Sequence, residues 1–121
     1  MTDLELDART WDGLEYLESV SGPGAIAELI QGFVHDAGPR LDRMNAALAA
    51  SERESLRGLA HDLKTNAATV GALQLSSLGA GIERSASTGS PADLAAMLDE
   101  AGSLLPRVLA ALEARAKRYP V

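Results

Sequence analysis

Residues 51–71 read SERESLRGLAHDLKTNAATVG, and they decide the fold. Ser51 and Glu54 have the spacing of a capping box, in which a serine and a glutamate three residues later accept hydrogen bonds from free backbone amides at a helix start. This spacing predicts a helix that begins near Glu52. Its apolar residues share one face until Gly71 offers a break, and they are Leu56, Leu59, Leu63 and Val70. The stretch is therefore expected to be an amphipathic helix with one face in a core.

Two helices are expected before this stretch. The first is short and covers about residues 10–20, with apolar residues at spacings of three, namely Trp11, Leu14, Leu17 and Val20. Residues 21–24 then break it, and Pro23 suits the first position of the next helix. That second helix covers about residues 24–50, and Gly38-Pro39 is expected to bend it.

Two more helices are expected after it. One covers about residues 72–87 and is weakened by Gly79 and Gly81. Ser90 is expected to cap the other, with Pro91 at its first position. The basic run at residues 113–118 is interpreted as a solvated helix end that complements the helix dipole. This order predicts an all-α fold, an antiparallel up-down four-helix bundle with a short additional N-terminal helix.

Composition excludes several classes of protein. A chain of 121 residues and 12.6 kDa is the size of one domain, so residues 1–121 are expected to form a single helical bundle domain. Hydrophobic residues are 46% of the chain but aromatics only 3%, which favours a core of leucine and alanine over an all-β fold. The net charge of −6, with dispersed basic residues, disfavours nucleic acid as a partner. The lack of cysteine excludes disulfides and cysteine nucleophiles.

The expected location is the cytoplasm. Residues 1–6 carry acids where a signal peptide would have a basic region and an apolar run. Residues 65–82 are free of charge, but their glycines and polar side chains would suit a membrane span badly. No interaction with a membrane is expected.

His61 is the candidate chemical group of the helix that follows residue 51. By helical arithmetic it lies opposite the apolar face, within a stripe of basic and small residues: Arg57, Gly58, Lys64, Thr65 and Ala68. The predicted docking surface for a partner is formed by Arg57, Gly58, Thr65 and Ala68. A neutral imidazole nitrogen is a good nucleophile, and an ammonium one turn away can offset the charge of a phosphoryl group. Periodicity does not separate such a phosphoryl carrier from an ordinary surface histidine, so both interpretations stay open.

Other candidate sites have less support. His35, beside Asp36 on the polar side of its helix, is interpreted as a solvated surface residue. A metal site would need His35, His61 and carboxylates to converge, but no His-x-x-x-His or Glu-x-x-His spacing occurs. No metal site is expected.

The region around His61 resembles the signature of histidine-containing phosphotransfer (Hpt) domains. The segment AHDLK at residues 60–64 is followed at the family spacing by Gly71-Ala72, Leu75, Leu78 and Ile82-Glu83. The helix before it also resembles the family, with its phenylalanine, mid-helix proline and later apolar residues: Phe33, Pro39, Leu41, Met44 and Leu48. The resemblance therefore extends over nearly the whole chain.

The resemblance implies a function and roles for two residues. His61 would be the phosphoacceptor, and Lys64 would support the phosphoryl group. Such domains relay phosphoryl groups between aspartates of receiver domains, here those of a hybrid histidine kinase or a response regulator in a bacterial-type two-component phosphorelay. They are carriers without kinase activity, and we expect no cofactor of the chain's own, since the receiver holds the Mg²⁺.

One departure from the family keeps an alternative open. The family usually has glycine where this chain has Thr65, and residues 61–65 also resemble the H-box of sensor kinases, except that Asn66 replaces its proline. The alternative is an H-box-related adaptor, or a receiver phosphatase without a stable phosphohistidine. Kinase dimerisation bundles pair two chains, whereas this chain is expected to supply a complete bundle as a monomer.

Overall fold

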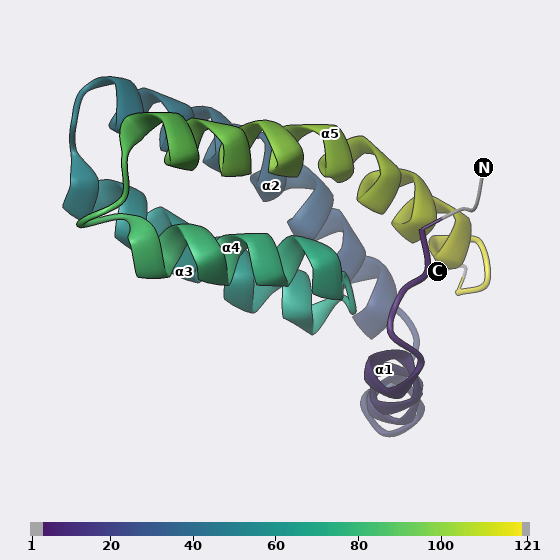
Figure 1. Ribbon diagram of the computed structural model, residues 1–121. Helices are drawn as coiled ribbons and strands as arrows, with labels where there is room; N and C mark the ends of the chain where they lie inside the picture. Colours follow the sequence, from purple (N-terminus) through teal and green to yellow (C-terminus); the bar gives the residue numbers. More distant parts are fainter. Residues whose placement is uncertain (1–3, 120–121) are drawn as a thin grey trace.

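The computed structural model describes residues 4–119, and all regular secondary structure in that range is helical (Figure 1). Its five helices are α1 (Ala8–Ser21), α2 (Ala25–Ala49), α3 (Arg53–Thr69), α4 (Leu73–Ser85) and α5 (Pro91–Ala116). The all-α prediction is confirmed. Residues 1–3, part of the acidic start cited against a signal peptide, lie outside the described residues. Between residues 4 and 119, no helix has the length and apolar character needed to cross a bilayer.

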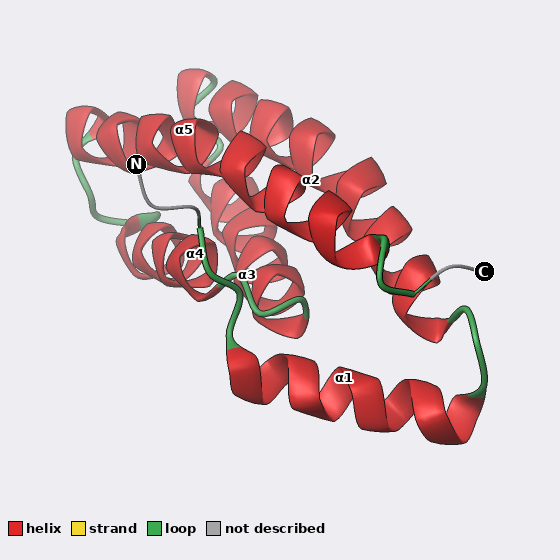
Figure 2. Ribbon diagram, turned by 90° about the vertical axis from the view of Figure 1, so that its right-hand side faces the viewer, coloured by secondary structure: helices red, strands yellow, loops and turns green. Residues whose placement is uncertain are grey.

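Helices α2 to α5 form the predicted antiparallel four-helix bundle. Each helix packs on the next one in the chain, and α2 also packs on α5, which closes the bundle. The contact between α3 and α4 is the most extensive of these. Helix α1 is the additional N-terminal helix, and it lies across one end of the bundle (Figure 2).

The core is made mainly of leucine and alanine, as the composition predicts. All five helices contribute to it, and its largest fully buried side chains include Trp11, Met44, Leu56, Leu63 and Leu98. The four helices of the bundle thus turn their apolar faces inward, and the polar face of α3 is left on the surface.

The capping box predicted at Ser51 and Glu54 is wrong. Ser51 has a φ of 57°, in the left-handed region, and the N-cap of α3 is Glu52, which makes no side-chain capping bond. Ser51 instead ends the preceding helix, because its amide and that of Glu52 donate to the carbonyls of Leu48 and Ala47. The link between α2 and α3 is short, so the hydrogen bonds that end α2 determine the backbone conformation of Ser51.

A proline was predicted at the first position of both α2 and α5, and the prediction is wrong for α2 and confirmed for α5. Pro23 is not at the first position of α2, because Gly24 is the N-cap and Ala25 follows it. Pro91 is at the first turn of α5 as predicted, and the side chain of Ser90 accepts a hydrogen bond from the amide of Asp93 at 3.1 Å.

Helix α1 is attached to the turn that joins α3 to α4. The Asp7 amide donates to the Gly71 carbonyl at 2.9 Å, and Trp11 Nε1 donates to the Val70 carbonyl at 3.0 Å. Gly71 has a φ of 77°, and a Cβ there would lie only 3.1 Å from the Asp7 nitrogen. The turn therefore requires glycine both for its backbone conformation and for its contact with α1.

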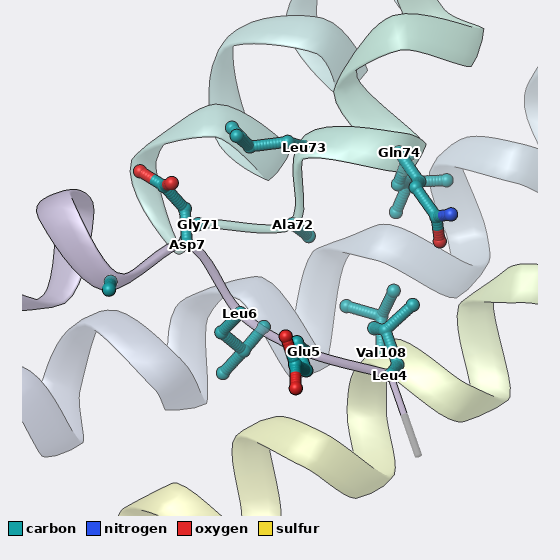
Figure 3. A pocket seen from close by; sticks show the side chains of 11 residues that line it. Leu4, Glu5, Leu6, Asp7, Gly71, Ala72, Leu73, Gln74 and Val108 are labelled. Carbon is teal, nitrogen blue, oxygen red and sulfur yellow. The ribbon is translucent and has the colours of Figure 1, made fainter. Parts of the chain in front are cut away.

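The segment before α1 runs past the same turn. Leu4 and Leu6 pack against the core, and this segment borders an open pocket of about 300 Å³ with the start of α4 and Val108 of α5 (Figure 3). Residues 4–7 thus extend the attachment of α1 onto the bundle.

Two of the four apolar residues at spacings of three in α1, Leu17 and Val20, do not face the core. They are 48% and 64% exposed, whereas Trp11 and Leu14 are the buried residues of α1. A spacing of three falls about 60° short of a full turn at each step, so Val20 lies on the opposite side of the helix from Trp11. The four residues therefore do not form one face.

The basic end of α5 is not simply solvated. The Arg115 guanidinium lies 4.7 Å from the centre of the Trp11 ring, and its side chain is only 25% exposed. Tyr119 stacks on the same tryptophan at 6.1 Å, and its hydroxyl donates to Glu15 at 2.7 Å. Arg115 and Tyr119 therefore pack against α1, and the prediction of a solvated run is wrong for Arg115.

Candidate functional site

His61 lies in the middle of α3, on the face that the bundle leaves open. Its side chain is 55% exposed, while its neighbours in sequence on the inner side, Ala60 and Leu63, are fully buried. The outward orientation predicted from helical periodicity is confirmed. The imidazole can therefore be approached by another molecule.

A carboxylate from the neighbouring helix joins His61 to Lys64. Glu83 of α4 lies with Oε2 at 2.9 Å from His61 Nδ1 and with Oε1 at 2.7 Å from Lys64 Nζ. Its side chain is only 19% exposed. One carboxylate thus bridges the imidazole and the ammonium, each through its own oxygen.

The charges around Glu83 favour its ionised form. The Lys64 hydrogen bond, and after it the His61 hydrogen bond, hold the pKa of the Glu83 carboxyl below its ordinary value, and these effects outweigh the raising effect of burial. The group is therefore a carboxylate at neutral pH, placed between one cation and one titratable ring.

A close contact between α3 and α4 brings Glu83 within reach. A Cβ on Gly79 would lie 2.8 Å from the Lys64 backbone nitrogen and 3.1 Å from the Ala60 carbonyl oxygen. Ser76, earlier on α4, donates its hydroxyl to the Lys64 carbonyl at 2.9 Å. Gly79 is thus a point of close packing between α4 and α3 beneath the site, and the expected weakening of α4 by Gly79 stays a prediction.

The predicted docking residues share the face of His61. Gly58 and Thr65 are exposed, Ala68 is half-buried, and a Cβ on Gly58 would meet nothing within 4 Å. Arg57 is also exposed, and it forms an ion pair with Glu54. The structure therefore brings these four residues together on one open surface of α3.

His35 takes no part in this arrangement. It is exposed on α2, with its Nδ1 3.0 Å from the carboxylate of Asp36. Across residues 4–119, no three histidine, aspartate or glutamate side chains are grouped as a metal site requires. The chemistry that the site offers is thus that of an exposed imidazole beside an ammonium.

Glu83 is the residue whose contribution the sequence reasoning missed. Its position in the motif was noted, but no role was given to it. The signal that could have found it is symmetry, because His61 and Glu83 are each eleven residues from Ala72, where α3 turns into α4. In an antiparallel helical hairpin, residues equally far from the turn lie at the same level.

Comparisons with known proteins support the family that the motif around His61 resembles. The family model described as "Hpt domain" matches residues 28–115. The crystal structure of histidine-containing phosphotransfer protein B from Pseudomonas aeruginosa PAO1 is similar, with a TM-score of 0.83 and 26% sequence identity. The match covers 95% of this chain and 96% of that one. The comparison with curated protein sequences gives no significant match.

Proposed function

Because the chain belongs to the Hpt domain family, we propose that it relays a phosphoryl group between receiver-domain aspartates in a bacterial-type two-component phosphorelay, with His61 as the phosphoacceptor. Hpt proteins are phosphoryl carriers rather than kinases, and they act with the receiver domains of kinases and response regulators. The observation that carries the proposal for this chain is the exposed His61 ring beside the Lys64 ammonium.

The transfer would proceed in two displacements. In the first, His61 Nε2 attacks the phosphorus of an aspartyl phosphate in line, so that an N–P bond forms and the aspartate carboxylate leaves. In the second, the carboxylate of another receiver attacks the same phosphorus and the imidazole leaves. Lys64 would offset the negative charge of the phosphoryl group.

The partner and the location follow from the same proposal. The receiver would dock on Arg57, Gly58, Thr65 and Ala68, and it would bring the Mg²⁺ that phosphoryl transfer needs, so the chain would have no cofactor of its own. The chain would act as one domain in the cytoplasm, where phosphorylated receivers are found.

The direct test is transfer from a phosphorylated receiver. Labelled phosphoryl receiver is mixed with the wild-type protein, with His61→Gln and with His35→Gln, and the acid-labile label on each is measured. We expect label on the wild type and on His35→Gln, which also removes an exposed histidine, but none on His61→Gln. Label retained by folded His61→Gln at the wild-type level would overturn the proposal.

The same mixture tests the alternative that Thr65 suggests. A receiver phosphatase would speed the loss of receiver phosphate without any trapped phosphohistidine, and Thr65→Ala would reverse that effect. An adaptor would bind the receiver but take no label, and Thr65→Gly would then gain transfer. A stable phosphohistidine on the wild type contradicts both alternatives.

A further inference from the structure

We propose that Arg57 exchanges partners during the relay: it pairs with Glu54 while His61 is unmodified and with the phosphoryl group once His61 carries one. This inference deepens the proposed function and rests on it for the residue that is modified. Because the exchange takes place within one chain, it can be measured without a receiver.

The first step concerns the cations available to a phosphoryl group on His61. Such a group brings up to about two negative charges and three acceptor oxygens, whereas Lys64 already donates to Glu83 at 2.7 Å. The other two basic residues of α3 are Arg53 and Arg57. The guanidinium of Arg53 donates to two backbone carbonyls in the link after α4, at 3.0 and 2.9 Å. Arg57 is therefore the remaining cation of this helix.

The second step concerns the position of Arg57. It lies one turn before His61 on the same exposed face. Residues four apart on a helix have Cβ atoms about 5–6 Å apart, and helical side chains lean toward the N-terminus, so the imidazole leans toward Arg57. The hydrogen bond and charge of Glu54 raise the pKa of Arg57 most, and the charge of Glu83, which contacts His61, raises it further. The guanidinium thus lies within electrostatic reach of the phosphoryl position.

The third step concerns the partner that holds Arg57 in the unmodified protein. Arg57 Nε donates to Glu54 Oε1 at 3.1 Å, and Nη2 donates to the same oxygen. The two side chains are 47% and 77% exposed, and an exposed ion pair of this kind adds little to stability. Glu54 therefore keeps the guanidinium near the imidazole without locking it in place.

The fourth step concerns the competition between two anions. A phosphoryl group on His61 Nε2 carries more charge than the Glu54 carboxylate, and its oxygens can accept two parallel hydrogen bonds from one guanidinium. Arg57 moves its hydrogen bonds to these oxygens, and no proton is transferred, since a guanidinium stays protonated. Glu54 then loses its partner. The loaded and the empty carrier thus present different charges to a docking receiver.

The test begins with the pKa of the phosphoryl group. All proteins carry His35→Gln, so that His61 is their single histidine. Phosphoramidate phosphorylates the imidazole, with ammonia as the leaving group, and the ³¹P shift is followed over a range of pH. A guanidinium beside the group favours its dianion, so we expect Arg57→Ala to raise this pKa by at least about 0.5. The control is Arg9→Ala, which removes an exposed arginine of α1 and should change nothing. An unchanged pKa in Arg57→Ala would overturn the inference.

A double-mutant cycle tests the exchange itself. Glu54→Gln removes the competing carboxylate, so we expect it to lower the pKa of the phosphoryl group while Arg57 is present. Loss of a nearby negative charge has the same sign, but that part persists in Arg57→Ala. The effect of Glu54→Gln should therefore be about half as large or less in the Arg57→Ala background. Glu113→Gln, which removes an exposed carboxylate of α5, should have no effect. No effect of Glu54→Gln, or equal effects in both backgrounds, would overturn the exchange.

Receiver assays separate this inference from the proposed function. A protein phosphorylated on His61 by phosphoramidate but by no receiver would overturn the relay, and the ³¹P titrations would still decide the exchange. Relay through His61 together with an unchanged pKa in Arg57→Ala would overturn the exchange and leave the relay standing. A protein that takes the phosphoryl group from neither donor would overturn both.

Discussion

Lys64 supplies a positive charge beside His61 in the proposed transfer, because both groups contact Glu83. Its Nζ lies 2.7 Å from Glu83 Oε1, and its side chain is partly exposed on the open face. We expect Lys64→Ala to slow transfer by about 100-fold, since removing one donor from an oxyanion site has an effect of that size. Lys64→Arg should recover part of the rate because it retains the charge. Wild-type transfer by Lys64→Ala in a rapid-quench measurement would contradict this role.

The Glu83 carboxyl gives the site a predictable pH dependence. Lys64 and His61 hold the pKa of the Glu83 carboxyl below its ordinary value in the folded protein, so the ionised carboxyl stabilises the fold. This contribution to stability is fully present above the pKa that Glu83 has in the unfolded chain. It is lost as the pH falls through the lowered pKa of the folded protein. We expect Glu83→Gln to be less stable than the wild type near neutral pH, and the difference to vanish in strong acid. Urea unfolding at a series of pH values measures it, and a difference that persists in acid would contradict the prediction.

A substitution at Thr65 is expected to affect the stability of α3 and the docking of a receiver differently. It is exposed within α3, so Thr65→Gly should lose up to about 1 kcal/mol of stability through helix propensity alone. Transfer should stay the same or become faster, since a side chain one turn from His61 is removed. Denaturant unfolding and transfer kinetics measure the two effects, and slower transfer by the folded variant would show that the threonine contributes to binding.

At the level of the helix, the turn at Gly71 supports both α1 and α3. Its φ of 77° and its contact with Asp7 leave no room for a Cβ. We expect Gly71→Ala to destabilise the protein by about 2 kcal/mol. It should also shift the fluorescence of Trp11, whose indole hydrogen bonds to the neighbouring Val70 carbonyl. Gly102→Ala is the control, because that site in α5 has open space for a Cβ, and it should be neutral or stabilising. Equal stability of the two variants would contradict the prediction.

Helix boundaries were predictable where one residue alone decides them. Ser90 and Pro91 start α5, and Gly71 ends the helix of His61, because capping, a fixed φ and a left-handed φ are local properties. The start of α3 was not predictable in this way. The conformation of Ser51 depends on the hydrogen bonds that finish α2, so a motif that would cap an isolated helix serves another helix here.

For the whole molecule, the sequence predicts the layers of the bundle but not the contacts across its ends. Amphipathic periodicity places the apolar faces of α2 to α5 in one core, and that arrangement is confirmed. The packing of Arg115 and Tyr119 on Trp11 joins residues about a hundred positions apart, and nothing in their local sequence indicates it. The contact of Glu83 with His61 and Lys64 was predictable in part. The symmetry of the hairpin predicts that Glu83 lies at the same level as His61, but it does not predict the hydrogen bonds.

The closed bundle predicts that the protein is a monomer. Helix α2 packs on α5 as well as on α3, so among residues 4–119 the four helices of the bundle enclose the core by themselves. The exposed apolar side chains of α1, Tyr16, Leu17 and Val20, form too small a set to replace such a core. Light scattering after gel filtration should therefore give a molar mass near 12.6 kDa at every concentration tested. A mass of twice that value would contradict the prediction. If Val20→Glu then returned the mass to that of a monomer, the dimer interface would lie on α1.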